Sequence, residues 1–241
     1  MSQPFLPSVR GCFVTGTDTG VGKTCISAGL LHWCAQQGWR SAGLKPVAAG
    51  MEWINDEYIN EDVRALRQAS SPGLTDADVG PYQFEAACAP HIAAQREGRV
   101  IERNVILRSA QALASRSDVL VVEGVGGFRV PLAPGWDTAD LASDLGLPVV
   151  LVVGLRLGCI NHTLLSAEAI VHRGLRLVGW IGNVLEPDMP SLDDNVACLR
   201  ESLGQQFRTP CLGLVPRLAD ASAASVRAHL VDTGLQAVFG K

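Results

Sequence analysis

The strongest clue to the fold is a glycine-rich segment, residues 16–24, which reads Gly-Thr-Asp-Thr-Gly-Val-Gly-Lys-Thr. It follows the short apolar, β-prone run 12–15 and opens a stretch with helical periodicity. Glycines let backbone N–H groups turn inward around phosphate oxygens, and a helix N-terminus adds partial positive charge. In this context Lys23 is placed to reach the terminal phosphates of a nucleotide, and Thr24 to bind Mg²⁺. The segment predicts the phosphate-binding loop of an ATP-consuming α/β enzyme.

The spacing of this loop differs from the common pattern. Residues 17–21 separate Gly16 from Gly22, which makes the loop one residue longer than usual. The alternative interpretation is a glycine-rich turn that only joins a strand to a helix. The Gly-Lys-Thr ending, in a strand–loop–helix context, favours the phosphate loop.

Strand and helix patterns alternate along the rest of the chain. Apolar, β-prone runs occupy residues 42–47, 118–123, 148–153, 177–181 and 211–215, and helical patterns occupy residues 23–37, 61–69, 101–115, 161–172 and 192–203. This alternation predicts parallel βαβ units with right-handed crossovers. We expect one α/β domain of the P-loop NTPase type, residues 11–241, with a mostly parallel central sheet and helices on both faces. A flexible N-terminal tail, residues 1–10, is expected to precede it.

The composition excludes several classes of function. Hydrophobic residues make up 47% of the 241 residues and charged residues 18%, which suffices for a sizeable core. The net charge of −4 and the absence of a basic run argue against a nucleic-acid partner. Residues 145–157, the most apolar stretch, are too few to span a bilayer, and residues 1–10 lack a signal-peptide pattern, so we expect no membrane partner. The seven cysteines form no C-x-x-C pair and sit mostly in apolar runs, as expected of reduced thiols in a cytoplasmic protein.

Two further charged residues stand at the ends of apolar strands. Glu123 closes the run 118–123 and precedes a glycine-rich segment, at the position where open α/β sheets bind ligands. It is a candidate metal ligand, although a solvated acid is the simpler alternative. Lys45 stands just before Pro46, where it could bind an anion or stabilise developing negative charge. A surface lysine that extends its amine into solvent is an equally open interpretation.

At several spaced motifs the chain resembles the dethiobiotin synthetases. The motifs are residues 13–24, Leu-Lys-Pro-Val-Ala at 44–48, Pro90-His91, Glu97-Gly98-Arg99, Val-Glu-Gly-Val-Gly-Gly at 122–127 and Leu-Gly-Cys-Ile-Asn-His at 157–162. The longer spacing of the phosphate loop is this family's own form. The resemblance implies a step of biotin biosynthesis in which 7,8-diaminopelargonate and CO₂ form a carbamate, ATP phosphorylates it, and the second amine closes the ureido ring. It also implies Mg²⁺ as a cofactor and a homodimer.

The resemblance assigns roles to individual residues. Lys45 and Lys23 are the expected catalytic residues, the first beside the carbamate and the second between carbamate and γ-phosphate. The expected Mg²⁺ ligands are Thr24, Asp62 and Glu123, although Asp62 without the resemblance is interpreted as a solvated helix acid. The expected nucleotide-binding residues are Thr19, Gly20, Val21, Gly22, Lys23, Thr24, Cys25, Asp62, Glu123, Gly124, Val125, Gly126, Asn183, Pro216, Arg217 and Leu218. The expected substrate-binding residues are Lys45, Ala49, Gly158, Cys159, Ile160 and Asn161.

Two of these assignments have specific alternatives. Asn183 is expected at the adenine ring, flanked by residues 216–218, but it could equally be a strand-end cap. Residues 158–161 precede a helical pattern, and the family binds the substrate's tail carboxylate at such a helix N-terminus across the dimer interface. An ordinary capped helix is the alternative there.

The chain also departs from the family pattern. Gly20 stands where a close relative has an acidic residue, and Ala49 and Ala89 stand where hydroxyl residues are common. These departures put substrate hydrogen bonds in doubt but not the phosphate site.

Three other functions fit part of the sequence. A partitioning-type regulatory ATPase would carry a signature lysine where this chain has Asp18. A cobyrinate-type amidating enzyme would need a glutaminase domain, for which 241 residues leave no room. A non-catalytic nucleotide-binding module would not require Lys45 and Glu123.

Overall fold

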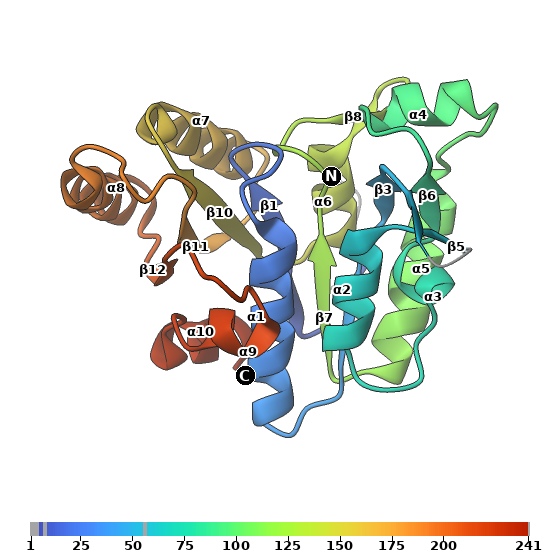
Figure 1. Ribbon diagram of the computed structural model, residues 1–241, viewed down its shortest axis with the longest axis horizontal. Helices are drawn as coiled ribbons and strands as arrows, with labels where there is room; N and C mark the ends of the chain where they lie inside the picture. Colours follow the sequence, from blue (N-terminus) through green and yellow to red (C-terminus); the bar gives the residue numbers. More distant parts are fainter. Residues whose placement is uncertain (1–4, 7–8, 55–56, 241) are drawn as a thin grey trace.

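A six-stranded parallel sheet forms the centre of the structure, a computed structural model that describes residues 5–6, 9–54 and 57–240 (Figure 1). In spatial order its strands are β12 (Cys211–Val215), β11 (Leu177–Val184), β10 (Val149–Leu155), β1 (Gly11–Gly16), β7 (Val119–Glu123) and β2 (Ser41–Leu44). Each neighbouring pair is parallel, which confirms the predicted sheet.

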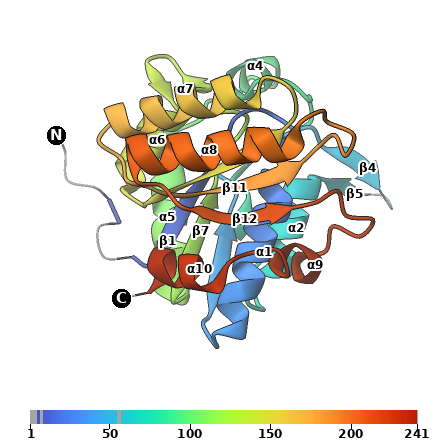
Figure 2. The same ribbon diagram turned by 90° about the vertical axis from the view of Figure 1, so that its left-hand side faces the viewer.

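Helices cover both faces of this sheet, as predicted. Side chains alternate between the faces, so Phe13 and Leu151 belong to one hydrophobic cluster while Val14 and Val150 belong to the other. The first cluster contains residues of α5 (Arg103–Arg116), α6 (Thr138–Leu145), α7 (Cys159–His172) and α8 (Leu192–Phe207). The second contains residues of α1 (Lys23–Gln36), α2 (Glu61–Ala69), α9 (Ala223–Arg227) and α10 (Asp232–Phe239). Figure 2 shows α7 and α8 on one side of β11 and β12, with α1, α9 and α10 on the other.

The expected strand at residues 42–47 is divided in the structure. β2 ends at Leu44, and after Lys45 and Pro46 the chain enters β3 (Val47–Ala49), which pairs with β6 (Tyr82–Phe84) outside the main sheet. Proline has no N–H to donate to a ladder, which explains the break. The division leaves Lys45 at the carboxyl end of β2, an edge strand of the central sheet.

The helix expected at residues 161–172 begins earlier, at Cys159. Gly158 takes a left-handed conformation (φ 91°), and the buried Cys159 side chain forms part of the first turn. Several short elements were not predicted because their patterns are too brief to show a period. They are β6, α3 (Asp76–Val79), α4 (Pro90–Arg96), α9, α10 and the antiparallel pairs β4 (Glu52–Ile54)–β5 (Glu57–Ile59) and β8 (Pro131–Ala133)–β9 (Trp136–Asp137).

The predicted tail falls partly outside the described residues, which exclude 1–4 and 7–8. Within it Leu6 is buried, and its N–H donates to the backbone oxygen of Leu145 (3.2 Å). All seven cysteines are free thiols, and Cys12, Cys34 and Cys159 are buried. In the described part of the chain, no helix combines the length and the apolar character needed to cross a bilayer.

Candidate active site

The phosphate loop joins β1 to α1 at the carboxyl edge of the sheet. Gly20 (φ 73°) and Gly22 (φ 87°) both lie in the left-handed region, which side chains other than glycine rarely adopt. The Lys23 side chain is buried and folds back over the loop, where Nζ donates to the backbone oxygen of Asp18 (2.9 Å). Both glycines therefore occupy positions where the backbone of the loop requires their conformational freedom.

Four predicted site residues meet at the N-terminus of α1. Thr24 Oγ1 lies 2.8 Å from Asp62 Oδ1 and 2.8 Å from Glu123 Oε1. Lys45 Nζ donates to Asp62 Oδ2 (2.7 Å) and to Glu123 Oε1 (2.6 Å). The side chains come from α1, α2, the end of β7 and the residue after β2, and both Lys45 and Glu123 are buried. We call these residues the charged cluster.

Burial and neighbouring charges shift the pKa values of Lys45, Asp62 and Lys23. Burial alone would lower the pKa of Lys45, but the carboxylates of Glu123 and Asp62 outweigh it and raise that pKa. Burial likewise opposes the ionised form of Asp62, yet Lys45 and the Thr24 hydroxyl hold its pKa below the usual value. Burial and the nearby Lys45 ammonium lower the pKa of Lys23 to about 8, with Glu123 acting in the opposite direction. The site therefore holds two ammonium groups and at least one carboxylate in a confined space.

The oxygen atoms of the charged cluster fit a magnesium ion. The single hydroxyl proton of Thr24 can satisfy only one of the two carboxylate oxygens at 2.8 Å. Glu123 Oε2 is buried and has no hydrogen-bond partner among the described residues. Two carboxylates and a hydroxyl are the hard oxygen ligands that Mg²⁺ takes beside nucleotide phosphates.

A cavity of about 290 Å³ opens beside the phosphate loop. Its lining includes Gly20, Gly22, Cys25, Asn183, Pro216, Arg217 and Leu218, so the structure brings these predicted nucleotide-binding residues together. Asn183 Nδ2 donates to the backbone oxygen of Val21 (3.0 Å). A Cβ on Gly22 would lie 2.3 Å from this side-chain nitrogen, and its φ of 87° is strained for any other residue, so the conformation favours glycine there.

The glycine-rich segment after β7 lies against the opposite side of the loop. The Gly124 N–H donates to the backbone oxygen of Val14 (2.9 Å). Gly126 has φ 62°, and a Cβ there would lie 3.4 Å from Thr19 Oγ1. Gly124, Val125 and Gly126 thus border the phosphate loop, next to Glu123.

The predicted substrate residues fall into two separate places. Ala49 belongs to β3, on the segment that also carries Lys45. Residues 158–161 form the start of α7, which follows β10. Arg156, which was not among the predicted site residues, joins this second place to the phosphate loop, because its Nη2 lies 2.5 Å from Asp18 Oδ2. Its position after a strand at the carboxyl edge of the sheet was the available signal.

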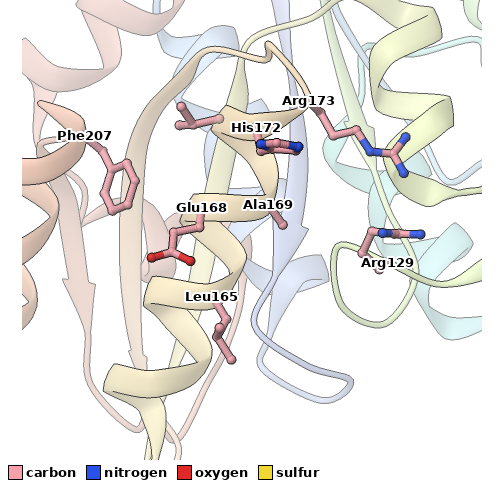
Figure 3. A pocket seen from close by; sticks show the side chains of 8 residues that line it. Arg129, Leu165, Glu168, Ala169, His172, Arg173 and Phe207 are labelled. Atoms are coloured by element: carbon pink, nitrogen blue, oxygen red, sulfur yellow. The ribbon is translucent and has the colours of Figure 1, made fainter.

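A groove of about 610 Å³ follows α7 (Figure 3), and its lining includes no residue of the charged cluster. Leu165 and Val171 line it and are 57% and 44% exposed. In Figure 3 Phe207 of α8 lies on one side of α7, and Arg129 and Arg173 lie on the other.

This chain is similar in sequence to known proteins over nearly its full length. Residues 10–225 match the family described as an AAA domain. A protein of Aromatoleum aromaticum named ATP-dependent dethiobiotin synthetase BioD is 50% identical over 223 residues, which cover 92% of this chain and 96% of that protein. A protein of the same name from Ralstonia nicotianae is 52% identical over 225 residues, covering 93% of this chain and 96% of that protein.

A solved structure gives an independent comparison of the fold. The MinC:MinD cell division protein complex of Aquifex aeolicus contains a chain that matches with a TM-score of 0.52, covering 96% of this chain and 93% of that one. The sequence identity is 15%, so the likeness concerns the fold alone.

Proposed function

This chain belongs to the ATP-dependent dethiobiotin synthetase family and to the AAA-domain family, and we propose that its charged cluster and phosphate loop carry out the ligase reaction of the synthetases. In that reaction 7,8-diaminopelargonate, CO₂ and ATP give dethiobiotin, ADP and phosphate. The observation that supports the proposal is the convergence of Lys45, Thr24, Asp62 and Glu123 beside Lys23 at the end of the phosphate loop.

The main difficulty of this chemistry is to bring two anions together, and the two lysines would supply the compensating positive charge. A carbamate oxygen must attack the γ-phosphorus, and both partners carry negative charge. Lys45 would hold the carbamate, and Lys23 would bridge the carbamate and the γ-phosphate. The first attack forms a P–O bond and releases ADP. The second amine then attacks the carbamate carbon, the C–O bond to the phosphoryl group breaks, and phosphate leaves.

Thr24, Asp62 and Glu123 would hold Mg²⁺, which when bound neutralises charge on the β- and γ-phosphates. Lys45 contacts both carboxylates in the structure, so these residues also position its ammonium group. The metal role of these residues is supported by their oxygen donor set and by the unpartnered Oε2 of Glu123.

The nucleotide would lie across the phosphate loop with its base in the 290 Å³ cavity. Thr19 and residues 20–25 would surround the phosphates, and residues 123–126 would lie beside them. Asn183 and residues 216–218 would contact the base. The shared lining of this cavity by Gly22, Cys25 and Asn183 supports the assignment.

The diamine would lie along Lys45 and Ala49, and residues 158–161 would bind its tail carboxylate at the N-terminus of α7, where the helix dipole favours an anion. We also propose that a second copy of the chain covers the α7 face, making a homodimer. Leu157, Leu165 and Val171, which are exposed on or beside α7, support this pairing. Seven free thiols are consistent with work in the reducing cytoplasm.

Phosphate release from ATP tests the function. We expect release to require the diamine and bicarbonate together, with only background release when either is omitted. A regulatory ATPase of the partitioning type would hydrolyse ATP without regard to the diamine, and that result would overturn the proposal.

A further inference from the structure

The segment that carries Lys45 and Ala49 is held outside the central sheet. β3 pairs with β6 in parallel, with Val47 opposite Tyr82 and Ala49 opposite Phe84. The bonding extends beyond β3, because the Gly50 N–H donates to the backbone oxygen of Phe84 (3.0 Å). We call residues 45–51 the substrate wall. Its position depends on that of the segment containing β6.

The start of the substrate wall depends on the same segment. The Lys45 N–H donates to the backbone oxygen of Val79 (2.7 Å), shortly before β6 begins. At the other end of the wall, the Met51 N–H donates to the backbone oxygen of Glu85 (3.1 Å). Any shift of residues 79–85 would therefore move the backbone of the proposed carbamate lysine.

Two side chains form hydrogen bonds with backbone groups on the edge of β6 that faces away from β3. Arg99 Nη1 donates to the backbone oxygen of Gln83 (2.8 Å), and Glu97 Oε1 accepts from the Glu85 N–H (2.8 Å). Residues of a strand bond alternately to opposite sides, so these are the groups that a third strand would pair. We call Glu97 and Arg99 the clasp.

The turn at the end of α4 aims both clasp residues at β6. Gly98 takes a left-handed conformation (φ 64°), its N–H donates to Gln95 O (3.2 Å), and the Arg99 N–H donates to Ala94 O (2.9 Å). This is a Schellman cap, in which the residues on either side of the glycine have fixed directions. The Arg99 guanidinium also lies 4.7 Å from the centre of the Phe84 ring.

α4 connects the clasp to the hairpin beyond the active-site edge. The helix begins at Pro90, and His91 Nδ1 lies 3.2 Å from the backbone oxygen of Pro131 in β8. α4 contacts β3, β6 and β8, and Figure 1 shows it beside these strands. Residues 90–91 and 97–99 are two sequence motifs with no assigned nucleotide or metal role. They lie at the two ends of α4, where the first contacts β8 and the second bonds to the segment containing β6.

We propose that Glu97 and Arg99 are positioning residues for the diamine side of the reaction, because they fix β6 and, through it, the substrate wall with Lys45 and Ala49. This inference rests on the proposed role of Lys45. The nucleotide side has a separate support, since the Thr17 N–H at the start of the phosphate loop donates to Val152 O in β10 (3.0 Å). We therefore expect loss of the clasp to impair the diamine side more than the nucleotide side.

The test compares steady-state kinetics with nucleotide binding in Arg99→Ala and Glu97→Ala. We expect kcat/KM for the diamine to fall about ten- to hundredfold, the effect of a small misplacement of reacting groups. The Kd for ATP, measured by calorimetry, should change by less than about twofold, as for independent sites. Glu97→Gln keeps an oxygen acceptor for the Glu85 N–H and should restore most of the diamine kcat/KM lost in Glu97→Ala.

Arg96→Ala is the matched control, since among the described residues Arg96 forms no ion pair or side-chain hydrogen bond, and it should behave as wild type. Equal losses for ATP and diamine, unchanged diamine kinetics, or equal impairment of Glu97→Gln and Glu97→Ala would overturn the clasp. If Arg99→Ala does not fold, the two Glu97 variants decide the question. Failure of the proposed function is distinguishable from failure of the clasp, because the wild-type protein itself would then release no phosphate in response to the diamine.

Discussion

The phosphate loop and the substrate wall lie at the same edge of the sheet, but different kinds of contact hold them in place. The loop is shaped by successive residues: glycines at 20 and 22 with positive φ, and a lysine that bonds back to the backbone of Asp18. The wall is bonded to residues farther along the chain, from Val79 to Glu85, and those are held in turn by Glu97 and Arg99. The shape of the phosphate loop is thus encoded locally, whereas the position of the substrate wall depends on tertiary contacts.

The largest expected effect comes from a substitution in the phosphate loop. Lys23→Ala should lower turnover by about a thousandfold, because a preorganised cation beside the γ-phosphate is lost. Diamine-dependent phosphate release measures the loss, and calorimetry should show weaker ATP binding as well. Turnover near the wild-type level would show that Lys23 of the phosphate loop takes no part in the reaction, and it would contradict the contrast drawn between the loop and the substrate wall.

Lys45→Met should separate the two regions, lowering turnover by about a hundredfold through loss of charge beside the carbamate. Retained ATP binding, measured by calorimetry, would assign Lys45 to the diamine side. A parallel loss of ATP binding would contradict that assignment.

The same substitution should also lower the free energy of unfolding by about 3–5 kcal/mol, because it leaves the buried Glu123 carboxylate without its ammonium partner. Urea unfolding measures this change. The double variant Lys45→Met, Glu123→Gln removes the unpaired charge and should recover most of the stability while remaining inactive. A double variant no more stable than Lys45→Met would show that the ion pair is not the cause.

The smallest expected effect is at the base end of the nucleotide cavity. Asn183→Ala removes one hydrogen bond to Val21 and should weaken ATP binding by about fivefold, with the diamine KM unchanged. Nucleotide titration checks it. A larger effect on the diamine than on ATP would reverse the proposed orientation of the two substrates.

The difference between the regions also decides how much of the site could be predicted from the sequence. The phosphate loop is one contiguous motif, and Glu123 and Lys45 were found because each ends an apolar strand of the central sheet. Asp62 had no such signal. Its place beside Thr24 depends on the turn before α2. There Asn60 Nδ2 donates to Gly50 O (2.9 Å), and Asn60 Oδ1 caps the helix by accepting from the Val63 N–H (3.1 Å).

The substrate wall could not be predicted for a physical reason. β3 and β6 have three residues each, too few for a period, and their pairing joins distant parts of the chain. Glu97 and Arg99 stood out only as a motif. Their hydrogen-bond partners, the Glu85 N–H and the Gln83 carbonyl oxygen, are backbone groups that carry no sequence signature.

The transfer of oxygen from CO₂ to phosphate tests the central claim most directly. If the phosphate loop delivers the γ-phosphate to a carbamate beside Lys45, the oxygen that joins carbon and phosphorus leaves with the phosphate. In a rapid-quench turnover started with ¹⁸O-labelled bicarbonate, before the label exchanges with water, mass spectrometry should find one labelled oxygen in each released phosphate. Unlabelled phosphate would mean that water takes the γ-phosphate, and it would contradict the account.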